Sequence, residues 1–179
     1  MMKRIAGMIL FKEEDLNKID NLISLTPEKL CKVPCFIHNR EEMDTLPFHL
    51  TLSVWDILEK NKVESLFSSI ELLEIELRVN DIKIKESNFN GGVFFNLHLA
   101  IEENLSLRKI QNYIYQKLPN EKYNPEHFII HITLACHEDY HQLFEIKKNL
   151  LKNFKPFKIK SSRLVLYEIY PANLIEVKG

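Results

Sequence analysis

Two stretches of four residues decide the fold of this chain: His49-Leu50-Thr51-Leu52 and His131-Ile132-Thr133-Leu134. In an extended strand, successive side chains point to opposite faces, so a His and a Thr two residues apart share one face. The aliphatic residues between them fill the other face. Each stretch therefore predicts a strand that buries one side and presents an imidazole and a hydroxyl on the other.

These side chains suit the transfer of a phosphodiester. An imidazole has a pKa near 6.5, so at neutral pH one histidine can accept a proton while a second one donates a proton. The first would take a proton from the attacking water, and the second would give one to the departing ribose oxygen. The two threonine hydroxyls can donate hydrogen bonds to the non-bridging phosphate oxygens. This scheme requires no metal.

Composition narrows the class of protein. With 45% hydrophobic residues, 27% charged residues and 4 glycines among 179 residues, the chain is typical of an ordinary globular protein with a sizeable core. Its 24 basic and 25 acidic residues give a net charge of −1. A protein that coats long nucleic acids would carry a basic excess, so an extended polyanion is not the favoured partner, whereas a small phosphate ligand or a single RNA end is compatible with this charge.

The cysteines and the amino terminus indicate the compartment. The chain has three cysteines, Cys31, Cys35 and Cys136. Three cysteines cannot all pair and are too few for a disulfide scaffold, which favours a reducing environment. The apolar run at 5–11 is short and meets the charged residues 12–15 without a cleavage site, so it is expected to be a strand and not a signal peptide. No apolar run is long enough to span a membrane. We expect a cytoplasmic monomer that does not bind membranes.

Periodicity predicts the order of the elements. Helices are expected at 13–25, 56–71, 106–118 and 140–154, where apolar residues recur at helical spacing. Strands are expected at 4–11, 48–54, 73–79, 82–85, 93–101, 128–136, 157–169 and 173–178, and 35–38 could be extended as well. In both halves the motif strand runs into a helix and then into further strands. This repeated order predicts two similar lobes within one domain, 1–179, that bring both motifs to one cleft.

The paired motifs, their separation and this order of elements resemble the 2H phosphoesterase superfamily. The most similar branch is the 2′-5′ RNA ligase or RNA 2′,3′-cyclic phosphodiesterase family. The resemblance covers essentially the whole chain, because the strand at 3–11 and the segment 165–168 look like that family's edge strands. It implies an α+β fold of two antiparallel lobes related by a pseudo-two-fold axis, with outer helices around a central cleft. It also implies metal-independent opening of a cyclic nucleotide phosphate, possible reverse ligation and no cofactor.

Carried over by position, the resemblance makes His49 and His131 the acid/base pair and Thr51 and Thr133 the phosphate donors. Further substrate contacts are weaker hypotheses.

Three aromatic residues, Phe11, Tyr167 and Tyr170, could stack on a base, although at least two of them are expected to pack against the sheet. Arg163 could bind a phosphate, with a solvated strand arginine as the alternative.

Two other functions fit parts of the sequence. A nucleotide- or RNA-end-binding module would keep the same fold with little turnover, although a pure binder has no need of two proton-transfer groups. A metal-dependent hydrolase could use the histidines near Cys136 or the segment from Cys31 to His38. His137 and His141 could chelate an ion if one helix carries both. His127 and His131 are too far apart along a strand to share an ion.

Overall fold

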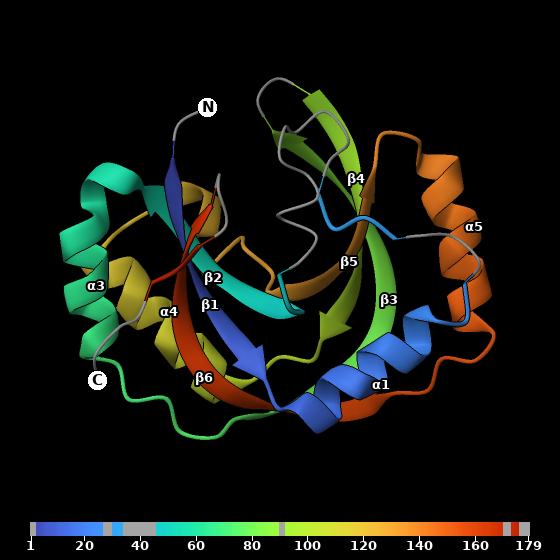
Figure 1. Cartoon of the computed structure of the whole chain (residues 1–179), viewed down its shortest axis with the longest axis horizontal. Helices are drawn as coiled ribbons and strands as arrows, with labels where there is room; N and C mark the ends of the chain where they lie inside the picture. Colours follow the sequence, from blue (N-terminus) through green and yellow to red (C-terminus); the bar gives the residue numbers. More distant parts are fainter. Residues whose placement is uncertain (1–2, 27–29, 34–45, 90–91, 170–172, 176–179) are drawn as a thin grey trace.

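The computed structural model describes residues 3–26, 30–33, 46–89, 92–169 and 173–175. Seven strands in these ranges form one antiparallel sheet in the order β1-β2-β5-β4-β3-β6-β7, and β1 also pairs with β6 (Figure 1). The predicted antiparallel α+β fold is confirmed. The two-fold relation between lobes stays a prediction.

The strands are β1 (Arg4–Phe11), β2 (His49–Asp56), β3 (Glu76–Phe89), β4 (Gly92–Ile101), β5 (His131–His137), β6 (Phe157–Ile169) and β7 (Asn173–Ile175). The α-helices are α1 (Glu13–Ile23), α3 (Lys60–Ser68), α4 (Leu105–Lys117) and α5 (Tyr140–Leu151), with short 3₁₀ helices η1 (Ile57–Glu59) and η2 (Glu121–Tyr123). No helix in the described ranges is long and apolar enough to cross a bilayer.

Most elements lie where the sequence pattern places them, and the larger differences in their boundaries have local causes or lie at their ends, as where α5 ends at Leu151 and not at 154. The strands expected at 73–79 and 82–85 are one long strand, β3, which bends at an irregularity between Val79 and Asp81. The helix expected at 56–71 is η1 followed by the shorter α3, because the Asp56 carboxylate accepts a hydrogen bond from Leu58 N and starts a 3₁₀ turn. Strand β5 begins at His131, three residues later than expected. The possible strand at 35–38 lies outside the described residues.

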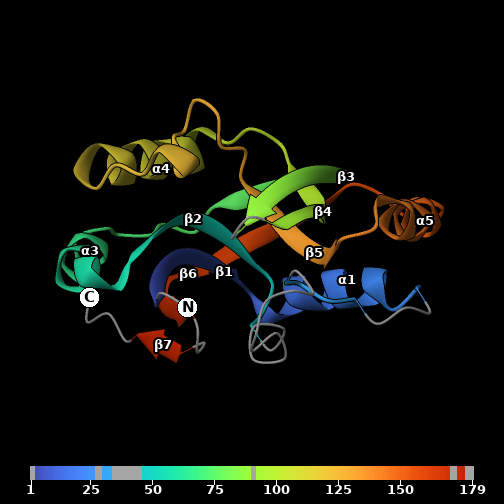
Figure 2. The same cartoon turned by 90° about the horizontal axis from the view of Figure 1, so that it is seen from above.

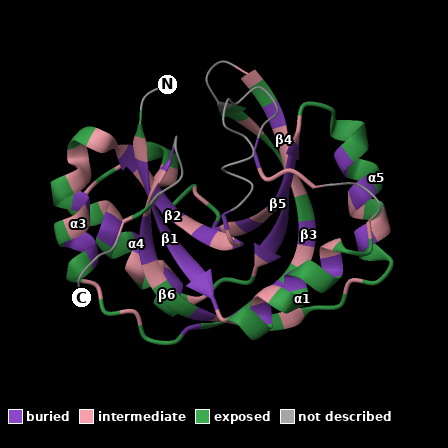
Figure 3. Cartoon of the chain, in the orientation of Figure 1, coloured by how far each residue is buried: buried purple, intermediate pink, exposed green. Residues whose placement is uncertain are grey.

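The alternation along the motif strands places the main core on one face of the sheet. Leu50, Leu52, Ile132 and Leu134 are at most 2% exposed and belong to this core. The helices cover the core from outside, with α3 and α4 toward one end of the sheet and α1 and α5 toward the other (Figures 1 and 2). Buried and exposed residues alternate along each of these helices (Figure 3). The opposite face of β2 and β5 is left for the polar motif residues.

Candidate active site

A single backbone pairing joins the two motifs. Leu50 of β2 is the partner of Ile132 of β5 in an antiparallel ladder. One step in either direction therefore sets His49 opposite Thr133 and Thr51 opposite His131. Directly opposed residues in such a ladder share a face and lie roughly 5 Å apart at Cβ. The four motif side chains thus gather on one surface, which we call the motif face.

The two motif histidines have the same local hydrogen bond. Nδ1 of His49 lies 2.8 Å from the carbonyl oxygen of Pro47, and Nδ1 of His131 lies 2.9 Å from that of Ile129. A carbonyl only accepts hydrogen bonds, so Nδ1 of each ring carries the hydrogen and donates it. Nε2 of each neutral ring is then a proton acceptor. Main-chain geometry, repeated in the two motifs, thus fixes the tautomer that general-base chemistry needs.

Burial keeps both motif histidines neutral. It lowers the pKa of His49 to about 4, more than the Pro47 carbonyl raises it, and the charges of Lys32 and His131 add to the lowering. The pKa of His131 is also lowered by burial, with a contribution from Lys85, against the effect of the Ile129 carbonyl. A bound phosphate would reverse this balance, because a nearby negative charge favours the protonated imidazole.

The threonines of the two motifs have different partners. Nδ2 of Asn96, on the neighbouring strand β4, donates a hydrogen bond of 3.1 Å to Oγ1 of Thr133. Within the described ranges, the Thr51 hydroxyl has no such partner. The motif face is therefore not symmetric, although its two sequence motifs are nearly identical.

A third histidine, which belongs to neither motif, lies beside this site. His98 of β4 is 6% exposed, and its ring centroid lies 4.6 Å from that of His131. Burial lowers its pKa to about 4, and the charge of His131 lowers it further. The sequence held a partial signal, since His98-Leu99-Ala100-Ile101 repeats the motif pattern with alanine in place of threonine. The pairing of β4 with β5, which brings the two rings together, was not visible in the sequence.

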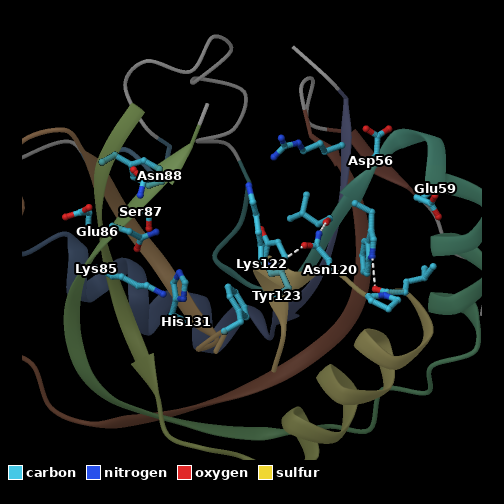
Figure 4. Close-up of a pocket in the computed structure, with 18 residues that line it drawn as sticks. Asp56, Glu59, Lys85, Glu86, Ser87, Asn88, Asn120, Lys122, Tyr123 and His131 are labelled. Atoms are coloured by element: carbon cyan, nitrogen blue, oxygen red, sulfur yellow. Dashed lines mark hydrogen bonds between the residues drawn. The ribbon is translucent and has the colours of Figure 1, made fainter. Parts of the chain in front are cut away.

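A cavity of about 910 Å³ opens beside the motif face. His131 and Asn96 border it. The charged residues of its lining are three cations and three carboxylates: Arg4, Lys85, Lys122, Asp56, Glu59 and Glu86. Aromatic residues also line it: Trp55, Phe94, Tyr123 and Phe128. Figure 4 shows Lys85 and Ser87 of β3 on one side of the cavity and Asp56 and Asn120 on the other, with Lys85 reaching toward His131. Cations and aromatic rings around one cavity suit a phosphorylated molecule with a planar base.

Two of the aromatic rings that line the cavity form a row that leads to the ring of His131. The ring centroids of Tyr123 and Phe128 lie 4.7 Å apart, and those of Phe128 and His131 lie 6.0 Å apart. Neither Tyr123 nor Phe128 was a candidate from the sequence, because neither belongs to a motif. An apolar ring row that ends at an imidazole offers a planar surface next to the reacting group.

The three described residues that the sequence suggested as further substrate contacts do not all lie on the motif face. Leu10 pairs with both His49 and Arg163, so the exposed Arg163 faces the same side as His49, two strands away. Tyr167 is half-buried and packs against a small apolar cluster on that side. Phe11 is 4% exposed and lies in the main core on the opposite face. The expectation that Phe11 contacts substrate is therefore corrected. Tyr170 lies outside the described residues.

The alternative metal site is not assembled by the described residues. His137 ends β5 and its Nδ1 accepts a hydrogen bond from Asp139 N, while His141 lies in the first turn of α5. The two are thus not on one helix, which the chelation hypothesis required. Within the described ranges, no group of three His, Cys, Asp or Glu side chains has the arrangement to hold a metal ion. Sγ of Cys136 donates a hydrogen bond to the carbonyl oxygen of Lys32, and Cys35 and His38 lie outside the described residues.

The fold is similar to that of two proteins of known structure. LigT of E. coli, solved with NADP⁺ and with ATP, has a TM-score of 0.53 at 16% identity, over 99% of this chain and 95% or 96% of LigT. Usb1 of Kluyveromyces marxianus has a TM-score of 0.53 at 12% identity, over 99% of this chain and 98% of Usb1. No protein-family model and no curated protein sequence matches this chain. The likeness shows that this chain shares its fold with LigT and Usb1.

Proposed function

We propose that this chain is a 2H-type phosphoesterase that opens 2′,3′-cyclic phosphates by two-histidine acid/base catalysis. One observation carries the proposal: the pairing of Leu50 with Ile132 puts His49, Thr51, His131 and Thr133 on one face. Two strands far apart in sequence thus supply two proton-transfer groups and two hydroxyl donors within reach of one phosphate. An arrangement of four such groups is more than a binding surface requires.

In the proposed reaction, one histidine Nε2 removes a proton from water as the water oxygen attacks phosphorus. The bond from phosphorus to one ribose oxygen breaks, and the other histidine, protonated when phosphate binds, gives its proton to that oxygen. Thr51 and Thr133 donate hydrogen bonds to the non-bridging oxygens, where negative charge is held throughout. Each positioned acid or base contributes roughly 10²- to 10⁴-fold in rate. With a 5′-hydroxyl in place of the attacking water, the same groups would join that hydroxyl to the phosphorus as the ring opens.

The substrate class follows from the cavity beside His131. Its cations, Arg4, Lys85 and Lys122, suit phosphate, and the rings of Tyr123 and Phe128 suit a base. An RNA 3′ end or a small cyclic nucleotide carries both groups. The complexes of LigT with NADP⁺ and ATP support a nucleotide ligand for this fold.

The decisive experiment measures hydrolysis of 2′,3′-cyclic AMP and of a short RNA ending in a cyclic phosphate, with EDTA present. Wild type is expected to be active, and His49→Ala and His131→Ala are each expected to lose about 10²- to 10⁴-fold in kcat/KM. His141→Ala, an exposed histidine away from the motif face, is the matched control and should keep wild-type activity. Full activity in both motif variants would disprove the mechanism.

One observation favours a second function, a nucleotide- or RNA-end-binding module. Burial leaves both motif histidines neutral at pH 7 before a ligand binds, so the free protein holds no ready acid. A binder would show saturable binding of AMP with no turnover of either cyclic phosphate. The same assays therefore separate the two functions.

A further inference from the structure

Asn96 is the residue outside the two motifs that touches a motif side chain most directly. It lies on β4, its Nδ2 is 3.1 Å from Oγ1 of Thr133, and it borders the same cavity as His131. The backbone partners of Asn96 are Lys85 on β3 and Cys136 on β5. The pairing of β4 with β5 is irregular between Leu97 and His98, next to Asn96.

The direction of this hydrogen bond constrains the Thr133 hydroxyl. A hydroxyl carries one hydrogen and two lone pairs, and an amide NH₂ only donates. Because the Asn96 amide fills one lone pair of Oγ1, the hydroxyl hydrogen of Thr133 must point to a different atom. Thr133 is half-buried, and no protein acceptor for its hydrogen is found in the described ranges. The hydrogen is left for an acceptor that the protein itself does not supply.

The other end of the Asn96 side chain argues against a purely structural role. Oδ1 of Asn96 is buried and has no hydrogen-bond partner among the described residues. A buried unpaired acceptor costs roughly 1–3 kcal/mol, so an apolar residue of similar size would stabilise the sheet better. Among the described residues, the one hydrogen bond that the Asn96 side chain makes is to the hydroxyl of Thr133.

We propose that Asn96 is a positioning residue that fixes the Thr133 hydroxyl as a donor to the non-bridging oxygen of the bound phosphate. The proposal rests on the phosphoesterase function proposed above and deepens it, because it makes the two threonines unequal. Thr133 is held in a donating orientation before the ligand arrives, whereas Thr51 must adopt one when the ligand binds. A donor that is already oriented toward the charged oxygen stabilises the transition state more, because the donor does not have to reorganise during the reaction.

A pair of double-mutant cycles tests this assignment. Asn96→Ala is combined with Thr133→Val and, as the matched control, with Thr51→Val. Asn96→Ala is expected to lower kcat/KM about 5- to 10-fold in the wild type and in the Thr51→Val background, the value of one hydrogen bond. In the Thr133→Val background it should change kcat/KM by less than about 2-fold, because the group it positions is gone.

The Tm of an Asn96 variant distinguishes a positioning role from a structural role, because loss of a structural residue would lower the Tm. Asn96→Leu removes the unpaired Oδ1, so its Tm is expected to equal or exceed that of the wild type while its kcat/KM falls. Equal losses from Asn96→Ala in the Thr133→Val and Thr51→Val backgrounds would overturn the proposal, as would loss of activity only in proportion to loss of Tm.

The two proposals fail in distinguishable ways. If the wild type hydrolyses cyclic phosphates and the cycles are additive, the role of Asn96 is wrong and the phosphoesterase function stands. If the wild type shows no turnover, the function is wrong, and the same cycles are then run on the Kd of AMP. Coupling of Asn96 to Thr133 alone in those values would support the positioning role, and additivity would overturn it.

Discussion

The rings of His98 and His131 lie 4.6 Å apart, centroid to centroid, with an interplanar angle of 49°. His98 is buried and its pKa is lowered to about 4, so it packs against the catalytic candidate as a neutral ring. Charging His98 would place a positive charge beside His131, which would oppose the protonation of His131 that the proposed reaction requires. The neutral ring thus supports His131 without competing for the proton.

This burial predicts that the fold loses stability in mild acid. His98 titrates near 4 in the folded chain and near 6.5 when unfolded, so the unfolded state binds the proton first as the pH falls. The stability contributed by neutral His98 is fully present above pH 6.5 and is lost between pH 6.5 and 4, by up to about 3 kcal/mol. His98→Phe should reduce this loss. Urea unfolding at pH 7 and pH 5 measures it.

His141→Asn is the matched control, because His141 is exposed and its loss should leave the acid sensitivity of the wild type unchanged. An identical drop in unfolding free energy from pH 7 to pH 5 in wild type and His98→Phe would contradict the assigned role of burial.

Phosphate binding should be accompanied by proton uptake. His49, with a pKa of about 4, is neutral at pH 7 in the free protein, and a bound phosphate favours its charged form. Affinity for AMP is therefore expected to rise as the pH is lowered from 8 to 6. Calorimetry in two buffers of different ionisation enthalpy counts the protons taken up. The uptake should shrink in both His49→Ala and His131→Ala, and a pH-independent Kd would count against the scheme.

Lys85 offers a test of the charge at the edge of the cavity. Its positive charge lowers the pKa of His131, and it borders the cavity. Lys85→Met should raise the pKa of His131, followed by NMR titration of the ring, and weaken AMP binding several-fold. Lys83→Met is the control, since Lys83 lies two residues away on β3, outside the cavity lining, and acts on His98 instead. The assignment fails if both variants shift His131 equally.

The sequence pattern predicted the motif strands because their alternation is a local property. Leu50 and Ile132 were correctly expected to face a core, and the histidines and threonines to face away from it. The boundaries that failed depend on local hydrogen bonds or distant pairing. Strand β3 runs through Asn80 and Asp81 because β4 pairs with it on both sides of that point, and neither residue favours a strand by itself.

The neighbours of the motifs could not be found from the sequence, because they depend on strand order. Strand β5 lies between β2 and β4, although β4 precedes it by about 30 residues in the chain. This order brings Asn96 and His98 against Thr133 and His131. The alternation of residue types along a strand specifies which face of the sheet a residue occupies. Only the register of two paired strands specifies which residues it contacts.

The contact between β1 and α3 predicts a sharp local limit on substitution. A Cβ added at Gly7 would overlap the ring of Phe67, a core residue that is 4% exposed. Gly7→Ala is therefore expected to lower the free energy of unfolding by about 1–3 kcal/mol, the usual cost of overpacking a close-packed interior. Equilibrium urea unfolding measures the loss. In a Phe67→Leu background, which removes the ring, the same Gly7→Ala change should cost clearly less than in the wild type. An equal cost in both backgrounds would show that the ring does not set the limit. Because β1 pairs with β2 at Leu10 and His49, the Gly7→Ala variant should also show whether strain in this strand reaches the motif face, as a change in kcat/KM beyond the change in stability.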